Sequence, residues 1–409
     1  MSEPGRRELS RRGLLGPEDG WSLAPVAAWL AIEGRRIADP MALLTGLAER
    51  LDAAGAHVDR LSFSVVTLNP LLLAWNCRWR RGEGTAIFRG GHGAQNSDAY
   101  IGSPLQFVRE QQRVFRRRLE SLDEERDHSF LHEMRAAGMS DYAALPMVFG
   151  TGTVNVLTVA TAAPPGFDDG SLERIEALAN LLAPLVEIIE ARRMALGLLD
   201  AFIGPRISER ILHGQVKRGD GDRIEAAFWY SDLRGFTALS ESLPAADLLH
   251  LLNDYFENCA TAAAVRGGEI LQFIGDAILI VVEITRPEDE ARVCEGALDA
   301  AIDAFDSIAV VNHRRRHGGL PQIEFGLGLH IGTVTHANVG APNRLAFNVV
   351  GPAVNKTARI QALSKEAGVP LLLSDEFARR VKRPLRSLGR FDLRGATGAH
   401  EVFAVEEER

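Results

Sequence analysis

The chain has 409 residues, which suits two domains better than one, so a boundary is expected near its middle. Hydrophobic residues make up 46% and charged residues 24%, as in globular proteins with buried cores, and the net charge of −8 argues against a general nucleic-acid or acidic-membrane binder. The three cysteines are far apart and lack metal-ligand spacing, so neither a disulfide framework nor a zinc site is predicted, and a reducing cytoplasm is expected.

Residues 1–20 form an arginine-rich stretch that we predict to be a mobile tail. Within it, Ser10 to Leu15 (SRRGLL) resembles a twin-arginine export motif. The GPEDG that follows is polar and turn-forming where an export signal needs an apolar segment. We therefore do not expect export.

Residues 21–167 show strand and turn patterns around one helix-like stretch. Strands are predicted in LSFSVVTL and LLLAWNCRW, separated by residues 69–70, and in YAALPMVF and VNVLTVAT, separated by residues 150–152. A helix is predicted over residues 104–122, and the Pro-Pro-Gly at residues 164–166 ends the domain. The pattern predicts an α+β domain.

A helical linker is predicted over residues 168–215, where apolar residues recur at steps of three and four. The apolar face consists of Ile175, Leu178, Leu182, Leu185 and Ile189. This spacing fits a short parallel coiled coil, and it fits equally a helix packed on its own domain. The segment 194–204 (MALGLLDAFIG) continues the linker as a joint into the second domain.

Residues 216–409 alternate strand and helix patterns. The predicted elements are, in chain order, strand 225–232, helix 244–265, strands 269–275 and 277–284, helix 288–316, strand 323–332 and a helix after Gly351. The order β-α-β-β-α-β is that of a ferredoxin-like arrangement with additions at its C-terminal end. The apolar run 277–282 is far shorter than the roughly 20 residues that a membrane-spanning helix needs, so no membrane span is predicted.

Two carboxylates stand at strand ends of this second domain. Asp232 ends the apolar strand FWYSD, and Asp276 follows a glycine in the tight turn between two strands. These strand ends are neighbours in the predicted arrangement, so both side chains are expected in one space. Together with backbone amides at Gly235, Phe236 and Thr237, they suit Mg²⁺ ions and a polyphosphate. Taken singly, either aspartate is more often a turn residue or a helix N-cap.

Four motifs, FWYSDLRGFTALSE, LQFIGDAILI, FGLGLHIGTV and NVVGPAVNKTARI, resemble in order and spacing those of class III nucleotide cyclases. The resemblance covers about residues 222–405 and implies a ferredoxin-like (βααββαβ) catalytic domain. It also implies the reaction, in which the ribose 3′-hydroxyl of a nucleoside triphosphate attacks the α-phosphorus and pyrophosphate leaves. Two Mg²⁺ or Mn²⁺ ions would be held by Asp232, Leu233 and Asp276, and the phosphates by residues 235–237.

The same resemblance implies further site residues. Asn355 and Arg359 lie four apart, so they share a helix face, and they would orient the ribose and stabilise phosphate charge. Arg394 matches a position where the family commonly has a lysine that contacts the terminal phosphates. In the family the carboxylates and the Asn–Arg face come from different subunits, so a head-to-tail homodimer is expected and a monomer should be inactive. Without the motifs, an Asn–Arg pair is most often a solvated helix face.

Two positions depart from the family pattern that selects the base. Adenine-selecting members have Lys and Asp, and guanine-selecting members tend to have Glu and Cys, where this chain has Gln272 and Asn348. A primary amide both donates and accepts and can flip, so the pair fits either base. We expect ATP as the substrate, with measurable turnover of GTP. The alternatives are a guanylate or dual-specificity cyclase, and a catalytically silent nucleotide-binding regulator.

Residues 40–190 resemble, more loosely, a GAF-type sensory domain, through YAALPMVFGTGTVNVLTVAT and the helix pattern that follows. The resemblance implies an unknown small-molecule or protein signal. The sequence does not identify the ligand, because His92, His128 and His132 are scattered and isolated histidines are more often structural. The order of sensor, helical joint and dimeric catalytic site predicts a regulated cytoplasmic adenylate cyclase. The competing hypothesis is a binding or dimerisation domain without signal input.

Overall fold

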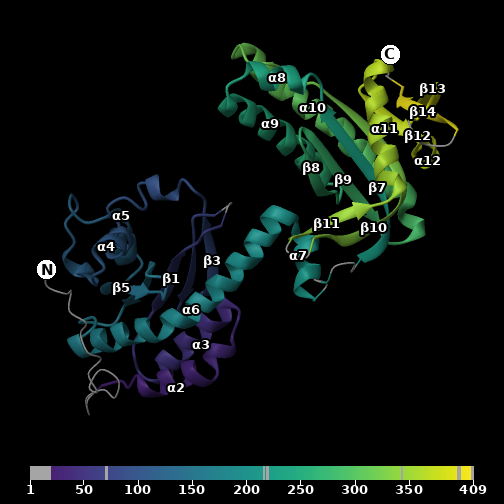
Figure 1. Cartoon of the computed structure of the whole chain (residues 1–409). Coiled ribbons are helices and arrows are strands. Elements are labelled where there is room, and N and C mark those ends of the chain that lie inside the picture. The colour runs from purple at the N-terminus through teal and green to yellow at the C-terminus, as the bar shows by residue number, and fades with distance from the viewer. Residues whose placement is uncertain are drawn as a thin grey trace. The chain divides into compact units, whose positions relative to one another are not determined.

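The computed structural model of the chain describes residues 20–409 apart from 70–71, 215–216, 218–220, 342–343, 394–397 and 407–409. The chain forms two compact units, residues 1–201 and 202–409 (Figure 1). Their boundary falls inside the segment 168–215 that the sequence predicts as a linker. The export-like motif at residues 10–15 and the predicted phosphate contact Arg394 lie outside the described residues.

The first unit is built on an antiparallel sheet with the strand order β3-β2-β1-β6-β5-β4. Its strands are β1 (Arg60–Val66), β2 (Ala74–Arg80), β3 (Gly84–Gly90), β4 (Phe115–Arg118), β5 (Asp141–Val148) and β6 (Val154–Thr161). Its helices are α2 (Ala24–Ile32), α3 (Pro40–Ala53), α4 (Pro104–Gln111), α5 (Ser129–Ala136) and α6 (Asp169–Ile203). The predicted α+β class is confirmed for this unit, and the GAF-like assignment stays a prediction.

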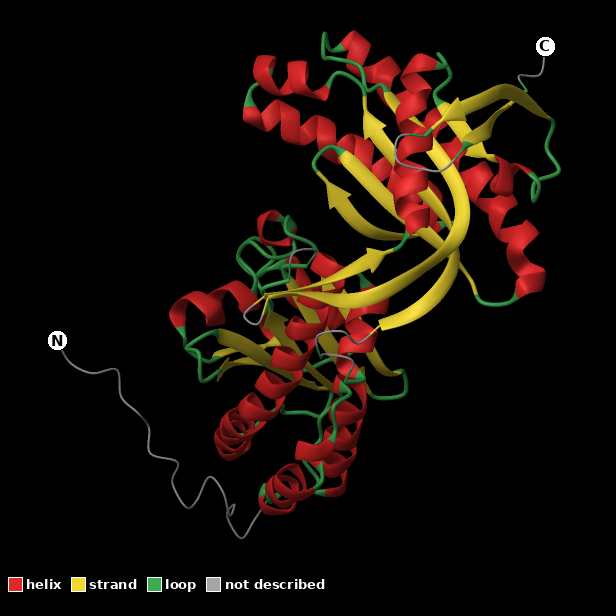
Figure 2. Cartoon of the chain, turned by 45° about the vertical axis from the view of Figure 1, so that its right-hand side comes forward, coloured by secondary structure: helices red, strands yellow, loops and turns green. Residues whose placement is uncertain are grey.

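The two faces of this sheet differ in chemistry, because successive side chains of a strand point to opposite sides. One face carries large apolar residues such as Phe63, Trp75 and Leu157, buried in a core with α3 and α6. On the other face, the apolar core lies beneath α4 and α5, where Tyr142 and Val156 are buried. Helices lie on both sides of the strands of this unit (Figures 1 and 2).

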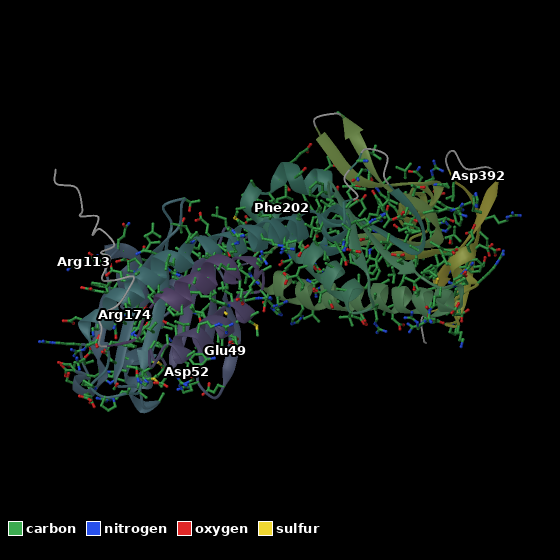
Figure 3. The ribbon with its side chains drawn as sticks, turned by 90° about the horizontal axis from the view of Figure 1, so that it is seen from below. Glu49, Asp52, Arg113, Arg174, Phe202 and Asp392 are labelled. Atoms are coloured by element: carbon green, nitrogen blue, oxygen red, sulfur yellow. The ribbon has the colours of Figure 1, made fainter. Side chains whose placement is uncertain are left out.

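Helix α6 buries its apolar face in its own unit. Leu178 and Leu182 are fully buried in the core shared with the sheet, and Ile175 and Ile189 are almost so. The buried residues of the helix end at Glu190, and the labelled Phe202 near its C-terminal end is 76% exposed (Figure 3). Of the two readings left open by the sequence, the structure supports a helix packed on its own domain.

Replacing Leu178 with alanine should lower the free energy of unfolding of the first unit by about 3 kcal/mol, because the lost side chain leaves a cavity in a closed core. The matched control is Ile188→Ala on the same helix, whose side chain is 67% exposed and should matter by less than about 0.5 kcal/mol. Urea unfolding followed by tryptophan fluorescence measures both variants. Equally small effects would contradict the burial of this face.

The helix predicted over residues 104–122 is wrong beyond residue 111. Helix α4 ends where Gln112 takes a left-handed conformation with φ 52°, and the chain then runs as strand β4 beside β5. Pairing across the sheet, for example of Phe115 with Ala144, overrides the local helix pattern. Helices α2 and α3 and the edge strand β3 have no counterpart among the predicted elements.

The second unit is built on a sheet with the order β13-β14-β12-β10-β7-β9-β8, and β11 pairs with β10. Its strands are β7 (Gly221–Leu233), β8 (Glu269–Ile274), β9 (Ala277–Ile284), β10 (Phe325–Ala341), β11 (Arg344–Val350), β12 (Leu371–Ser374), β13 (Leu385–Asp392) and β14 (Ala399–Val405). Its helices are α7 (Pro205–Leu212), α8 (Phe236–Ser242), α9 (Ala245–Ala264), α10 (Glu290–His317), α11 (Pro352–Glu366) and α12 (Asp375–Ala378).

The antiparallel core β10-β7-β9-β8 has the strand order of the predicted ferredoxin-like arrangement, with α9 and α10 in the connections. Strand β10 continues to Ala341, beyond the predicted end at residue 332, because β11 pairs along its second half as a hairpin. Among the described residues, no helix is both long enough and apolar enough to cross a membrane.

Helix α11 lies directly against β10. This close approach depends on Gly328, where a Cβ would lie 2.7 Å from the backbone nitrogen of Gln361 and 2.8 Å from the carbonyl oxygen of Thr357. Both obstacles are backbone atoms, so no side-chain rotation would relieve the clash. The glycine therefore sets how closely α11 sits on the sheet, and with it the position of Asn355 and Arg359 on that helix.

Candidate active site

Asp232 and Asp276 lie next to each other at one end of the strands of the second sheet. Asp232 lies near the end of β7 and pairs in register with Ala277 of β9. Asp276 occupies the two-residue turn between β8 and β9, which Gly275 opens with φ 65°. The two carboxyl groups are close enough for each to act on the ionisation of the other. The structure thus brings together the two aspartates that strand order predicts to be neighbours.

The carboxyl pair is electrostatically unfavourable by itself. Partial burial, followed by the neighbouring carboxyl group of Asp276, raises the pKa of Asp232 to about 7. Burial also raises the pKa of the neighbouring Tyr230, and the two aspartates add to that shift. Two carboxylates this close repel each other unless they share a proton or a cation.

The pair fits a hard divalent cation. Carboxylate oxygens are the ligands that Mg²⁺ and Mn²⁺ prefer, and the backbone carbonyl of Leu233 follows directly after Asp232. In the part of the chain that the structure describes, no group of three or more His, Cys, Asp or Glu side chains could enclose a metal ion. Mg²⁺ commonly combines one or two carboxylates with waters and substrate phosphates, so two aspartates suit a metal that binds together with a nucleotide.

Buried hydrogen bonds hold the strand end that carries Asp232. The Ser231 hydroxyl accepts from Trp229 Nε1 at 2.9 Å and from the Tyr255 hydroxyl at 2.7 Å. Tyr255 lies on α9 and is fully buried, so these bonds tie the end of β7 to that helix. Sequence reasoning missed this support, since residues 231 and 255 have no spacing that signals contact.

The segment after the first aspartate turns sharply at Gly235. This residue is exposed, has φ 71° and has open space where a Cβ would be, and it caps the short helix α8. The first amides of a helix, here at Phe236 and Thr237, have no acceptor within the helix. The chain thus presents backbone donors shortly after Asp232.

Asn355 and Arg359 lie one turn apart on α11, on a side that the sheet does not bury. Asn355 is exposed and Arg359 is half-buried, whereas Thr357 is fully buried against the sheet. Among the described residues, no hydrogen bond or ion pair joins either side chain to Asp232 or Asp276. Within one copy of the chain, the Asn–Arg face and the carboxylates are therefore not in direct polar contact.

Gln272 and Asn348, the predicted base-recognition pair, lie on strands that touch. Gln272 is exposed on β8, next to an irregularity in the pairing with β9. Asn348 is half-buried on β11, and its Oδ1 accepts from the backbone N–H of Val349 at 2.8 Å. Strands β11 and β8 contact each other within the unit, although no hydrogen bond joins the two amides in the described structure.

A partly buried ionic group beside Asn355 anchors α11. Lys356 Nζ donates to Glu376 Oε1 at 2.5 Å, and Glu376 Oε2 lies 3.8 Å from His330 Nδ1. His330 Nδ1 is also 2.8 Å from the Ser374 hydroxyl. The group joins α11, α12 and β10, and it was not predictable from sequence because its members are far apart along the chain.

The contribution of His330 to the stability of the second unit should fall on acidification. Burial lowers the pKa of His330 to about 4 from its ordinary 6.5; Glu376 opposes the shift, and Lys356, His400 and Arg380 reinforce it. Between these pH values the unfolded state binds the extra proton, so stability falls as pH falls and is fully present above the unfolded pKa. The free energy of unfolding of the wild type minus that of His330→Asn, measured with urea, should therefore fall by about 2 kcal/mol between pH 7 and pH 5. The difference isolates His330, because the raised pKa of Asp232 acts on the stability of the same unit in the opposite direction over this range.

His330→Asn removes this contribution and no other, because the titrating group is gone while a polar side chain remains. The control is His250→Asn, which removes an exposed imidazole of the same unit and should leave the slope unchanged. A pH profile of His330→Asn that runs parallel to that of the wild type would contradict the assignment.

Comparison with known proteins finds a family match for residues 222–406. The family described as "Adenylate and Guanylate cyclase catalytic domain" matches residues 222–406. "Adenylate cyclase 1" of Rhizobium meliloti (strain 1021) is 29% identical over 189 residues, which are 45% of this chain and 28% of that protein. "Adenylate cyclase" of Anabaena cylindrica is 34% identical over 159 residues, which are 38% of this chain and 30% of that protein. The crystal structure of the guanylyl cyclase Cya2 is 28% identical, covers 46% of this chain and 93% of that chain, and has a TM-score of 0.40.

Residues 222–406 are therefore a class III adenylate/guanylate cyclase catalytic domain. The chain spans less than a third of the length of the two curated relatives. The family match lies wholly within the second unit, and the family includes both adenylate and guanylate cyclases. Such catalytic domains generally use divalent metals, which agrees with the donor chemistry of the aspartate pair.

Proposed function

We propose that the chain is an adenylate cyclase, which converts ATP to 3′,5′-cyclic AMP and pyrophosphate at a site shared between two copies. The observation that carries this proposal is the pair Asp232 and Asp276, which the pairing of β7 with β9 brings to the same end of the strands, where Asp276 helps raise the pKa of Asp232. A lone aspartate in a turn needs no ligand to explain it, whereas a divalent cation would relieve the repulsion within this pair.

The reaction forms a bond between the ribose O3′ and the α-phosphorus and breaks the bond to the pyrophosphate oxygen. Two bound metal ions would lower the pKa of the attacking hydroxyl and neutralise charge on the triphosphate. Asp232, Asp276 and the Leu233 carbonyl would hold them, and the amides of residues 235–237 would donate to phosphate oxygens. The chain's remaining task is to position the ribose and phosphates.

Asn355 and Arg359 supply that positioning from the second copy. The amide of Asn355 orients the ribose, and the planar guanidinium of Arg359 stabilises charge that develops on the phosphates. Arg394 is proposed to contact the terminal phosphates. A two-fold, head-to-tail homodimer then contains two equivalent sites. The lack of polar contact between Asp232 and the Asn–Arg face within one copy supports this division.

Gln272 and Asn348 are proposed to read the base with little discrimination. Gln272 can donate to adenine N1 while Asn348 accepts from N6, and both amides can turn over for guanine. Neither base then leaves a buried polar group unpaired, so selectivity is weak. ATP remains the proposed substrate, with measurable GTP turnover; a guanylate or dual-specificity cyclase is the alternative.

The double variant Gln272→Lys with Asn348→Asp should raise the ratio of kcat/KM for ATP over GTP at least roughly tenfold, or about 1.4 kcal/mol. Lysine only donates and an ionised aspartate only accepts, which matches adenine and leaves guanine mispaired. Initial rates with each nucleotide measure the ratio, and the melting temperature of the variant shows whether it is still folded. If the wild-type protein already prefers one nucleotide by more than about a thousandfold, the prediction that the amide pair discriminates weakly between adenine and guanine is contradicted.

Product analysis tests the proposed function. The purified chain is incubated with ATP and, separately, GTP, in Mg²⁺ and in Mn²⁺, with Asp232→Ala as the blank. Cyclic AMP that disappears in the variant supports an adenylate cyclase, and the cyclic GMP yield reports selectivity. A dimeric protein that forms no cyclic product in any condition favours the second candidate, a nucleotide-binding regulator.

Control by the first unit is part of the proposal. The chain order, a folded α+β unit followed by the long helix α6 and the catalytic unit, supports it. The full chain is compared with residues 205–409 for turnover and dimer affinity. If both quantities are unchanged, the first unit is a binding or dimerisation domain without signal input.

A further inference from the structure

Three arginines without a carboxylate partner gather on one face of the sheet of the first unit, where a fourth, Arg80, lies opposite Arg60 and is ion-paired with Glu83. Arg60 lies on β1 and Arg78 on β2, and Arg78 pairs directly across the sheet with Ser62, two positions from Arg60. Successive even-numbered residues of β1 share this face, so Ser64 lies on it as well. Arg109 reaches the same face from α4, where its Nη2 donates to the Ser64 hydroxyl at 3.0 Å. We call Arg60, Arg78 and Arg109 the arginine cluster.

The polar partners of the cluster are neutral. Arg60 Nη1 donates to Thr158 Oγ1 at 3.0 Å, and that hydroxyl is 2.8 Å from Ser62 Oγ. Within the described ranges, no carboxylate forms an ion pair with any arginine of the cluster, and Arg109 Nε is buried without a hydrogen-bond partner. Burial lowers the pKa of Arg60; the nearby Tyr142 opposes this shift, and the positive charges of Arg78 and Arg80 add to it.

Each arginine of the cluster has an aromatic ring against it in place of a carboxylate. The guanidinium carbon lies 5.4 Å from the ring centre of Phe130 for Arg60, 4.2 Å from Phe88 for Arg78 and 5.7 Å from Tyr100 for Arg109. Such contacts use the flat face of the guanidinium and leave its in-plane N–H donors for other acceptors. Those donors form the fork that binds carboxylate and phosphate groups in two-pronged fashion.

The cluster costs stability unless a negative charge joins it. Like charges at neighbouring positions of a sheet repel, and a buried guanidinium loses hydration that neutral hydroxyls only partly replace. The whole chain carries a net charge of −8. The positive charge of the three arginines is therefore a local feature and does not reflect the composition of the chain. Arg60 is only 6% exposed, which gives a large polyanion little access and favours a small ligand.

We propose that the arginine cluster binds a small organic anion through a carboxylate or phosphate group, on the sheet face flanked by α4 and α5. The serine and threonine hydroxyls supply further hydrogen bonds, and the three aromatic rings form apolar walls beside the charged group. This site is independent of the cyclase chemistry in the second unit. The competing explanation is that the arginines only cover aromatic side chains.

The test uses the full chain and two probes, inorganic phosphate and succinate, at millimolar concentrations in buffer with EDTA. Chelation removes divalent metals, which would otherwise recruit anions to the aspartate pair. Thermal unfolding and isothermal titration calorimetry are recorded for the wild type, Arg78→Gln and Arg109→Gln. The matched control is Arg80→Gln, on the same strand and face as Arg78 but ion-paired with Glu83 at 2.8 Å.

At least one probe should bind the wild type and raise its melting temperature. The dissociation constant should rise at least roughly tenfold in Arg78→Gln and Arg109→Gln, and stay near the wild-type value in Arg80→Gln. Binding of phosphate alone or succinate alone identifies the charged group of the ligand. Without either probe, Arg78→Gln should melt no lower than the wild type, because it relieves repulsion.

Three results would overturn the proposal. The first is that neither probe binds the wild type, and the second is that Arg80→Gln weakens binding as much as Arg78→Gln does. The third is that Arg78→Gln destabilises the probe-free protein while probe binding is unchanged, which is the behaviour of an arginine that only covers a ring.

Discussion

Asp232→Ala should reduce cyclase activity by roughly a thousandfold or more, because one of the two side chains that hold the metals is gone and several kcal/mol of charge stabilisation go with it. Initial rates of cyclic nucleotide formation in Mg²⁺ and in Mn²⁺ measure the loss. Asp232→Asn should lose activity comparably, because it preserves the shape of the side chain but removes the charge that a divalent cation needs.

The control for this loss is Asp306→Ala, which removes an exposed carboxylate on α10 of the same unit and should retain wild-type activity. The melting temperature of Asp232→Ala in metal-free buffer separates a functional loss from misfolding. It should not fall, because the raised pKa of Asp232 means that its ionised form is disfavoured in the folded chain. Retention of more than about a tenth of the wild-type activity would remove Asp232 from the metal site.

Mixing Asp232→Ala with Arg359→Ala should restore about a quarter of the wild-type activity, although each variant alone is nearly inactive. Random exchange of subunits makes half of the dimers mixed, and a mixed head-to-tail dimer has one intact site and one doubly altered site. Arg359→Ala alone should lose roughly a hundredfold or more, because the guanidinium stabilises charge in the transition state. The rate after subunit exchange is compared with the sum of the separate rates.

Two further mixtures control the experiment. Asp232→Ala with Asp276→Ala should stay inactive, because both changes fall in the same half-site and no mixed dimer contains an intact site. Arg359→Ala with Asn355→Ala should stay inactive for the same reason. Failure of the Asp232 and Arg359 mixture, in a protein shown to exchange subunits, would mean that each copy completes its own site.

The sequence by itself determined the helices and strands whose pattern of apolar residues lies within the element, and the segments that contain long family motifs. Alternating and continuous apolar runs located β7, β8 and β9, and the strand order that follows from β-α-β-β-α-β placed Asp232 beside Asp276. A strand can be recognised from its own residues when apolar and polar side chains alternate, or when apolar side chains occupy both of its faces. The residues of the strand itself are then sufficient to predict it. The same locality explains why the helix pattern after residue 111 was misleading, since pairing with β5 decided that segment.

Only the tertiary structure decided which surfaces face each other. The apolar stripe of α6 fits a coiled coil and a packed helix equally, and the buried position of Leu178 against the first sheet distinguishes them. The group of Lys356, Glu376 and His330 and the arginine cluster likewise join residues far apart in the chain. Such contacts depend on side-chain direction and distance across separate elements, and the periodicity of one element contains no information about its partner.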